Sequence, residues 1–497
     1  MIVKRIFYGG FSVCLLTLLI IVMRYPQNNL IPAKMFLYTL IWVSILCAAG
    51  FFLSSLEALF KRKGVNLEKI SRVALMIYVV IYGITLYIVS LVLRSEPVTD
   101  YGSVYNTALC LASGQPAEEW EYFSTWGNNV GTLTILSFCM RLGVGLGFSD
   151  PYYFVLFLNV MYVAATLLSV FYLAGRTNAG SISNEKSIAR QWLALCIFTL
   201  WTPVWASTNG FYSDQLSFGG GVIAAALLLM AGRLNSWRKG LLAAAAGMIW
   251  GTAIAAKSTA AVGWIAVLIA VTCCRQWKRW WKRLLLSGTA MLLTIAAFSL
   301  IGAQYPSKAD ESRLKAPLEY WFALGLLGDG TYGDNMDFIQ EFFSRQNAEE
   351  KKEYCRQVIR ENRSNFFERE HLVRKTSVIF GTGEIAPINL SYPYKESVLW
   401  HFFYWTGDYY WKYACLATSF FFAVLFLMLV GTFLRALKKR EESWLVFACY
   451  LTVFGMFLFL MLWEAQNKQF YNLIPWMTLA VVSGLDFIKP ADLSPRA

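Results

Sequence analysis

Long apolar runs, separated by short polar segments, are the main pattern along this chain. Many windows of about 20 residues carry no charged side chain, and an α-helix needs about that length to cross the hydrocarbon core of a bilayer. The pattern predicts an all-α polytopic membrane protein with about twelve membrane-spanning helices. The predicted spans are residues 6–24, 35–59, 71–93, 152–174, 188–207, 215–232, 240–256, 258–274, 283–303, 411–436, 444–463 and 468–487.

A further apolar stretch, residues 131–148, is ambiguous because it contains Arg141 and four glycines. Cytoplasmic loops of membrane proteins collect Lys and Arg. If Lys4 and Arg5 are cytoplasmic and 131–148 does not cross, the basic loops "KRKGVNLEK" and "RQWKRWWKR" both fall on the cytoplasmic side. We therefore expect 131–148 to lie in the outer interface, in a multi-pass plasma-membrane protein with both termini cytoplasmic.

This topology leaves two large segments outside the membrane. The first is expected to carry interfacial helices, and the second to be a mixed loop region with no apolar run long enough to cross. The predicted division is 1–93 for the N-terminal spans, 94–151 for the first external loop, 152–303 for the central spans, 304–410 for the second external region and 411–497 for the C-terminal spans.

The composition agrees with a membrane protein and narrows the chemistry. Of 497 residues, 57% are hydrophobic and 15% charged, and the net charge is +13. Basic cytoplasmic loops explain this charge, so nucleic-acid binding is not expected. Two histidines are too few for a histidine metal site. A divalent metal at the aspartates of "GDGTYGDNMD" is conceivable, but a polar loop is favoured there, and no metal or other cofactor is expected.

A carboxylate, Asp100, emerges from the membrane at the start of "TDYGSVYNTALCLASG". Apolar residues recur there at helical spacing, and Gly114 supplies a stop, so the segment predicts a short amphipathic helix. Asp100 or Thr99 could cap this helix by accepting from its first free N–H groups. The alternative is that Asp100 acts as a general base beside the bilayer.

Four more outer segments carry polar residues between apolar runs. Each has an ordinary interpretation: a solvated turn for Asp214, a harmless surface cation for Lys257, an ion pair for Glu464 with Lys468, and an interfacial aromatic belt for the segment that contains Asn128 and Asn129. Together they place several charged groups at one depth, the external mouth of the bundle. That arrangement suits a lipid-linked phosphate, because a cation binds the phosphate and a carboxylate deprotonates an attacking hydroxyl.

These segments resemble the GT-C superfamily of polytopic glycosyltransferases, in particular its protein O-mannosyltransferase-like branch, glycosyltransferase family 39. The chain matches the family's first-loop pattern with Asp100, Tyr105, Ala108, Leu111 and Gly114, and further segments are similar in "STWGNNVG", "FYSDQ", "AKSTA", "HLVRKTSVIFGTGE" and "WEAQNKQFYNLIP". Gln466 and Lys468 stand where the family usually has arginine, and lysine cannot make arginine's bidentate contact to a phosphate.

The resemblance implies a GT-C-like helical bundle and an inverting transfer of a sugar from a polyprenyl-phosphate donor to a hydroxyl acceptor on a protein, a lipid or a cell-envelope glycan. Asp100 would be the general base, with Asp214 as a second catalytic carboxylate. Residues implied in substrate binding are Tyr101, Tyr105, Asn128, Asn129, Lys257, Lys375, Glu464, Lys468 and Tyr471. Among these, the lysines would neutralise the leaving phosphate.

Two other functions stay open from the sequence. A lipid-linked glycan polymerase or ligase would use basic residues in its late external region, and residues 345–375 are rich in them, although a solvated surface helix has the same composition. A transporter or flippase would need ionisable residues at mid-membrane depth. Glu57 is the one obvious candidate, and it lies near the inner end of its predicted span.

Overall fold

The structure is a computed structural model, and it describes residues 2–117, 119–177, 187–232, 237–305, 316–385, 393–437 and 443–485. Within these ranges every regular element is a helix, and one isolated antiparallel bridge joins Ser95 to Pro393. The prediction of an all-α protein is therefore confirmed. The longer helices are α1 (Ile2–Arg24), α2 (Pro32–Arg62), α3 (Leu67–Val92), α7 (Tyr152–Ala174), α12 (Arg238–Ala256), α14 (Trp277–Gly302), α20 (Tyr410–Leu437) and α21 (Trp444–Leu462).

Nine helical stretches in the described ranges are long and apolar enough to cross a membrane. Eight are the helices just named, and the ninth, Ser213–Ala231, combines α10 (Ser213–Phe218) and α11 (Gly220–Ala231). The other three predicted spans correspond to shorter helices, namely α8 (Ile188–Thr199) with α9 (Thr202–Ala206), α13 (Ala261–Cys273), and α22 (Ile474–Leu485). The count of twelve stays a prediction, and the C-terminal residues 486–497 lie outside the described ranges.

Close packing of small residues holds the bundle together. A Cβ atom on Gly247 of α12 would lie 2.1 Å from the carbonyl oxygen of Ser287 in α14, and one on Gly251 would lie 2.7 Å from that of Met291. Glycines four residues apart thus let two backbones touch, as is common between helices in membranes. Many apolar side chains of α1, α2, α3 and α14 remain exposed on the outside of the bundle, where lipid would cover them.

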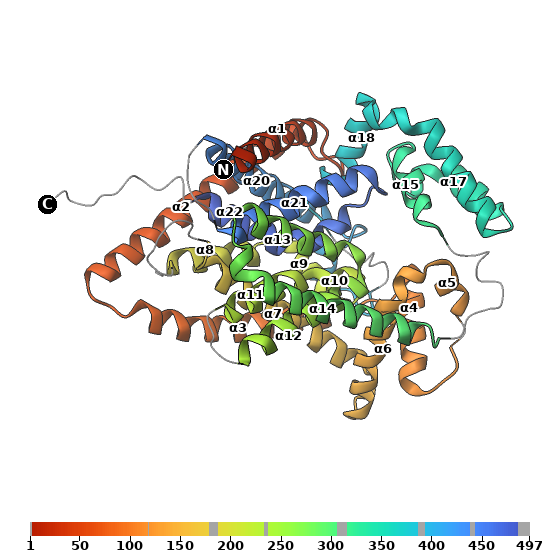
Figure 1. Cartoon of the computed structure of the whole chain (residues 1–497), viewed down its shortest axis with the longest axis horizontal. Coiled ribbons are helices and arrows are strands. Elements are labelled where there is room, and N and C mark those ends of the chain that lie inside the picture. The colour runs from red at the N-terminus through yellow and green to blue at the C-terminus, as the bar shows by residue number, and fades with distance from the viewer. Residues whose placement is uncertain are drawn as a thin grey trace.

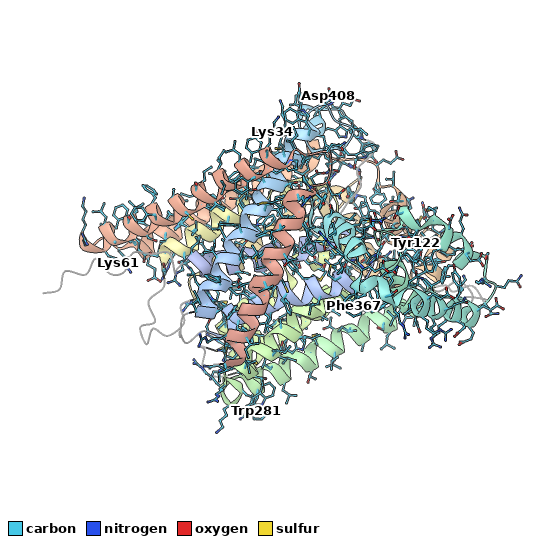
Figure 2. The ribbon with its side chains drawn as sticks, turned by 90° about the horizontal axis from the view of Figure 1, so that it is seen from above. Lys34, Lys61, Tyr122, Trp281, Phe367 and Asp408 are labelled. Atoms are coloured by element: carbon cyan, nitrogen blue, oxygen red, sulfur yellow. The ribbon has the colours of Figure 1, made fainter. Side chains whose placement is uncertain are left out.

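Residues 94–151 and 304–410 are named the first and second external segments after their predicted side, and most of their labelled helices lie at one end of the long axis (Figure 1). The first forms α4 (Thr99–Ser113), α5 (Trp120–Thr125) and α6 (Val130–Gly145). The described part of the second forms α15 (Leu318–Leu326), α16 (Met336–Ser344), α17 (Ala348–Asn362), α18 (Arg369–Phe380) and α19 (Val398–Phe403). Lys61, in the last turn of α2, lies at the opposite end from Tyr122 (Figure 2).

Helix α6 covers most of the ambiguous stretch 131–148. It has 16 residues and packs against α4, α7, α12 and α14. It is shorter than the helices that qualify as membrane spans, so it fits the expected helix at the rim of the bundle. Its depth relative to a bilayer stays a prediction.

Candidate functional site

A cavity of about 470 Å³ opens where the two external segments meet the ends of the bundle helices. Its size falls within the range of small-molecule sites. Its wall combines residues far apart in the sequence: Gln27, Asn28, Val98, Thr99, Asp100, Tyr101, Tyr212, Thr331, Tyr332, Gly333, Val378, Thr382, Glu384, Tyr410, Glu464, Ala465, Gln466, Asn467 and Lys468. Of the sequence-predicted site residues, Asp100, Tyr101, Glu464 and Lys468 are brought together here.

Asp100 lies in the first turn of α4, exposed and on the cavity wall. Val98 is the N-cap residue, and no side chain caps the helix, so the predicted capping by Thr99 or Asp100 is wrong. The reason is that the helix begins one residue early, with Thr99 itself at a φ of 54°, an uncommon conformation for a β-branched residue. The predicted stop at Gly114, in left-handed conformation, is confirmed. The Asp100 carboxylate therefore does not cap its own helix.

Tyr122 contacts the Asp100 carboxylate, and Tyr212 in turn contacts Tyr122. The Asn129 amide donates to the Tyr122 hydroxyl oxygen over 2.6 Å, which leaves the Tyr122 proton to be donated onward, and Asp100 is among its hydrogen-bond partners. Burial, with the nearby charge of Asp100, raises the pKa of Tyr122 and of Tyr212. Both phenols thus stay protonated as hydrogen-bond donors.

Glu464 and Lys468 reach the cavity from the turn between α21 and α22. Glu464 is 4% exposed and accepts a hydrogen bond from Gln466. Burial raises the pKa of Glu464 to about 7, although Lys468, Gln466 and Lys257 lower it. The predicted ion pair between Glu464 and Lys468 is not formed, and the half-buried Lys468 ammonium has no hydrogen-bond or ion-pair partner among the described residues. An unpaired cation on a cavity wall is a ready site for an anion.

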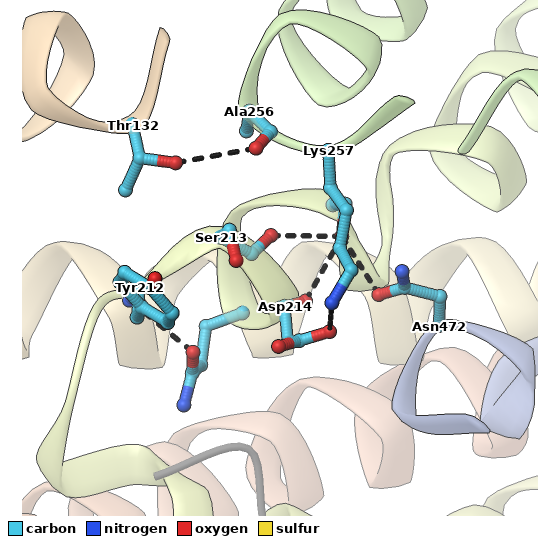
Figure 3. Close-up of polar contacts among 9 residues, drawn as sticks. Thr132, Tyr212, Ser213, Asp214, Ala256, Lys257 and Asn472 are labelled. Atoms are coloured by element: carbon cyan, nitrogen blue, oxygen red, sulfur yellow. Dashed lines mark hydrogen bonds and ion pairs between the residues drawn. The ribbon is translucent and has the colours of Figure 1, made fainter. Parts of the chain in front are cut away.

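Asp214 and Lys257 form a separate, closed pair. The Lys257 ammonium points directly at the Asp214 carboxylate (Figure 3), and the Asp214 side chain is fully buried. Neither residue lines the cavity. The pair joins α10 to the C-terminal end of α12, where the Thr132 hydroxyl also donates to the Ala256 carbonyl over 3.2 Å. The sequence predicted a catalytic role for Asp214 and a phosphate-binding role for Lys257. In the structure the two side chains pair with each other.

The remaining predicted binding residues lie around the cavity rather than on it. Tyr105 packs edge-on against Tyr152, with ring centroids 5.1 Å apart. Asn128 is exposed in the short turn before α6. Tyr471 is buried against Phe218, with ring centroids 4.5 Å apart. Their part in substrate binding stays a prediction.

Lys375 is buried inside the second external segment. Its ammonium donates to the carbonyl oxygen of Gly325 in α15, and burial lowers the pKa of Lys375 to about 7. It does not line the cavity. In this structure it links α18 to α15.

The structure adds functional candidates that the sequence did not single out, chiefly Glu384, Asn28 and Tyr332. Tyr332 lies in the loop before α16, and the charges of Asp100 and Glu464 contribute to raising its pKa. Glu384 is 6% exposed and accepts a hydrogen bond from Asn28. The sequence contained one indication for Glu384: it closely follows the apolar residues of "SVIFGTGE". A carboxylate that is buried there needs a hydrogen-bond or charge partner. Asn28, in a turn between two spans, gave no signal of its own.

No three metal-ligating His, Cys, Asp or Glu side chains come together within the described ranges. Near "GDGTYGDNMD", the Asp329 carboxylate accepts from the Thr331 N–H at 2.8 Å and from its hydroxyl at 2.6 Å, and the Asp334 carboxylate accepts from the Asp329 N–H at 3.2 Å. These carboxylates serve the loop itself. This agrees with the polar loop expected there.

No protein-family model and no curated protein matches this chain. Among solved structures, the chain is similar to ArnT from Cupriavidus metallidurans, crystallised bound to undecaprenyl phosphate. The identity is 13% and the TM-score 0.34, and the match covers 83% of this chain and 77% of that one. A likeness of this degree does not establish a family for this chain.

Proposed function

We propose that this chain is a membrane glycosyltransferase that moves a sugar from a polyprenyl-phosphate donor to a hydroxyl acceptor, with Asp100 as general base. One observation carries the proposal: an uncapped carboxylate, Asp100, and an unpaired ammonium, Lys468, line the same cavity. A base and a phosphate-binding cation are the two groups that this transfer needs from the protein.

In the proposed transfer, Asp100 accepts a proton and Lys468 binds the phosphate. Asp100 takes the proton of the acceptor hydroxyl as the acceptor oxygen bonds to the anomeric carbon from the side opposite the phosphate. The bond from that carbon to the phosphate oxygen breaks, and the oxygen keeps the electron pair. Lys468 neutralises the charge that develops on the phosphate. The sugar is transferred with inversion.

The other wall residues support these two groups. Tyr122 orients the Asp100 carboxylate, Tyr212 supports Tyr122, and Tyr332 lies within the electrostatic reach of both Asp100 and Glu464. Glu464, whose pKa is raised to about 7, changes charge near neutral pH. The lipid-linked form of the donor follows from the resemblance, and a site beside apolar, lipid-facing helices suits such a donor.

The transporter alternative has less support. Its candidate Glu57 accepts hydrogen bonds from the Ala189 N–H at 2.9 Å and the Ser187 hydroxyl at 3.3 Å, and it pairs with Lys61 at 3.1 Å. This carboxylate links α2 to the start of α8. It is engaged in structure rather than free for an ion or proton pathway.

The test compares cell-envelope glycans and glycoproteins in source cells that lack the chain and carry the wild type, Asp100→Asn or Glu96→Gln. Glu96 is an exposed carboxylate four residues before Asp100 and is not on the cavity wall. We expect a sugar that is present with wild type and Glu96→Gln and missing with Asp100→Asn at equal expression. A product that is unchanged in Asp100→Asn would overturn the mechanism.

A further inference from the structure

A second group of residues on the cavity wall, here called the second pole, is built around Glu384. Its wall comes from the turn between α1 and α2, the end of α18 and the start of α20, with Gln27, Asn28, Thr382, Glu384 and Tyr410. The proposed transfer uses none of these residues. A buried carboxylate on a cavity wall is costly unless it is paired or serves a ligand.

Glu384 has no cationic partner among the described residues. Its carboxylate accepts from the Asn28 amide and the Thr382 hydroxyl. Burial raises the pKa of Glu384 to about 7, and only those two hydrogen bonds oppose it. The charged groups that affect the pKa of Glu464, namely Lys468, Lys257 and Asp100, are not among the causes of the pKa shift of Glu384.

The direction of the hydrogen bonds leaves the two amide groups of this pole with free acceptor oxygens, beside the Tyr410 hydroxyl, which can donate or accept. Asn28 donates from its NH₂ group to Glu384 and so keeps its carbonyl oxygen free. Ser377 donates its hydroxyl proton to the Tyr25 carbonyl at 2.6 Å, so it accepts from the Gln27 amide at 2.8 Å. Gln27 therefore also keeps its carbonyl oxygen free. Neither oxygen has a partner among the described residues.

The free acceptor oxygens of this pole favour a ligand that donates hydrogen bonds. Phosphate offers acceptors and negative charge, which Glu384 and two carbonyl oxygens repel. A peptide offers a carbonyl acceptor for every N–H donor, and its acceptors would be left unpaired here. Sugar hydroxyl groups can all donate, and the ring of Tyr410 adds a flat apolar surface of the kind that pairs with amphipathic ligands. A sugar also carries the hydroxyl that the reaction end of the cavity needs.

We infer that the pole formed by Gln27, Asn28, Thr382, Glu384 and Tyr410 is the acceptor subsite, and that the acceptor is a glycan rather than a protein side chain. This inference rests on the proposed transferase function and names the acceptor class for the same cavity. One sugar residue binds at Glu384 through several donated hydroxyl protons. A hydroxyl of the same glycan then reaches Asp100.

The experiment uses the cells described above, with Glu384→Gln, Glu384→Asp and Glu396→Gln added. Glu396 is an exposed carboxylate outside the cavity and serves as the matched control. The envelope is digested with protease, and mass spectrometry locates the sugar whose attachment depends on Asp100. We expect it on a protease-resistant glycan, reduced at least tenfold by Glu384→Gln, which replaces an acceptor oxygen with a donor. Glu384→Asp should keep more product than Glu384→Gln, and Glu396→Gln should keep all of it. Thermal unfolding of each purified variant shows whether a loss reflects folding.

The outcomes separate the two proposals. If Asp100→Asn removes a sugar that is attached to serine or threonine of a protein, or to an amine, the acceptor inference fails while the transferase function stands. If Glu384→Gln folds and leaves the glycan product unchanged, the subsite is overturned. If Asp100→Asn changes nothing, the transferase function fails and the acceptor inference fails with it.

Discussion

Two acid–cation pairs that look alike in the sequence have opposite fates in the structure. Asp214, in α10, and Lys257, at the end of α12, form a buried ion pair. Asp100, in the first turn of α4, and Lys468, between α21 and α22, lie on the wall of one cavity, and neither forms an ion pair within the described residues. The difference teaches that a carboxylate stays available for chemistry when no nearby cation pairs with it.

The closed pair gives the largest expected effect, and it is on stability. Lys257→Met should leave the Asp214 charge buried without its partner and lower the free energy of unfolding by about 3–5 kcal/mol. Denaturant unfolding of the purified protein in detergent measures this loss. Arg374→Gln is the control, because it breaks an exposed pair with Glu370 and should cost about 1 kcal/mol or less. Equal losses for the two variants would contradict a buried, closed pair.

The open site should make stability depend on pH through Glu464. Its pKa is raised from 4.5 to about 7 in the folded protein, so the folded state binds more protons than the unfolded state between these values. Stability should therefore fall as pH rises from about 4.5 to about 7, by at most about 3 kcal/mol. Glu384, with a pKa also raised to about 7, acts in the same direction. Unfolding temperatures at pH 5 and pH 7 check the sign.

The matched variant for this pH effect is Glu464→Gln, which cannot titrate. Its unfolding temperature should fall less between pH 5 and pH 7 than that of the wild type, with the remaining slope due to Glu384. Lys375 does not contribute to the change in stability between pH 5 and pH 7. Its pKa is lowered from 10.5 to about 7, so its titration raises stability only above pH 7. A wild type that gains stability over the window would argue against a buried Glu464.

The free ammonium of Lys468 should matter for the donor phosphate. Lys468→Met should weaken binding of undecaprenyl phosphate to the protein in nanodiscs by about 10- to 100-fold, as expected from a lost charge-assisted hydrogen bond of about 1.5–3 kcal/mol. Lys468→Arg should bind at least as well as the wild type, because a guanidinium can contact a phosphate through two N–H groups. Unchanged affinity in Lys468→Met would show that the phosphate lies elsewhere.

The smallest effect concerns Tyr122, which donates to Asp100. Tyr122→Phe should slow sugar transfer by about two- to tenfold, in line with one hydrogen bond of about 0.5–1.5 kcal/mol. The loss should fall on kcat rather than on KM, because Tyr122 contacts the proposed base and does not line the cavity. Tyr354→Phe, in the second external segment and off the cavity wall, is the control. An unchanged kcat in Tyr122→Phe would contradict a role for this hydroxyl beside Asp100.

Periodicity and apolar run length were enough to predict the helices, because a membrane-spanning helix needs about 20 apolar residues whatever its neighbours are. The helix at Asp100 and its stop at Gly114 were predictable because helical spacing of apolar residues and a glycine stop are local signals. The cap was not, because the chain enters α4 through Thr99 in a left-handed conformation that no residue type announces.

The partners of charged residues could not be predicted, since they depend on which turns the fold brings into contact. The sequence favoured Glu464 with Lys468 because they are four residues apart, yet Glu464 bonds to Gln466. Asp214 and Lys257 are 43 residues apart and pair. Glu384 depends on Asn28, 356 residues away, so its role on the cavity wall could be seen only in three dimensions.

The most direct measurement is the rate of sugar transfer by the purified Asp100→Asn variant, with envelope membranes from cells lacking the chain as the source of donor and acceptor. We expect a loss of at least about 100-fold, the lower range for removing a general base, with an unchanged unfolding temperature and unchanged affinity for undecaprenyl phosphate. Transfer at the wild-type rate by the folded variant would contradict Asp100 as the base.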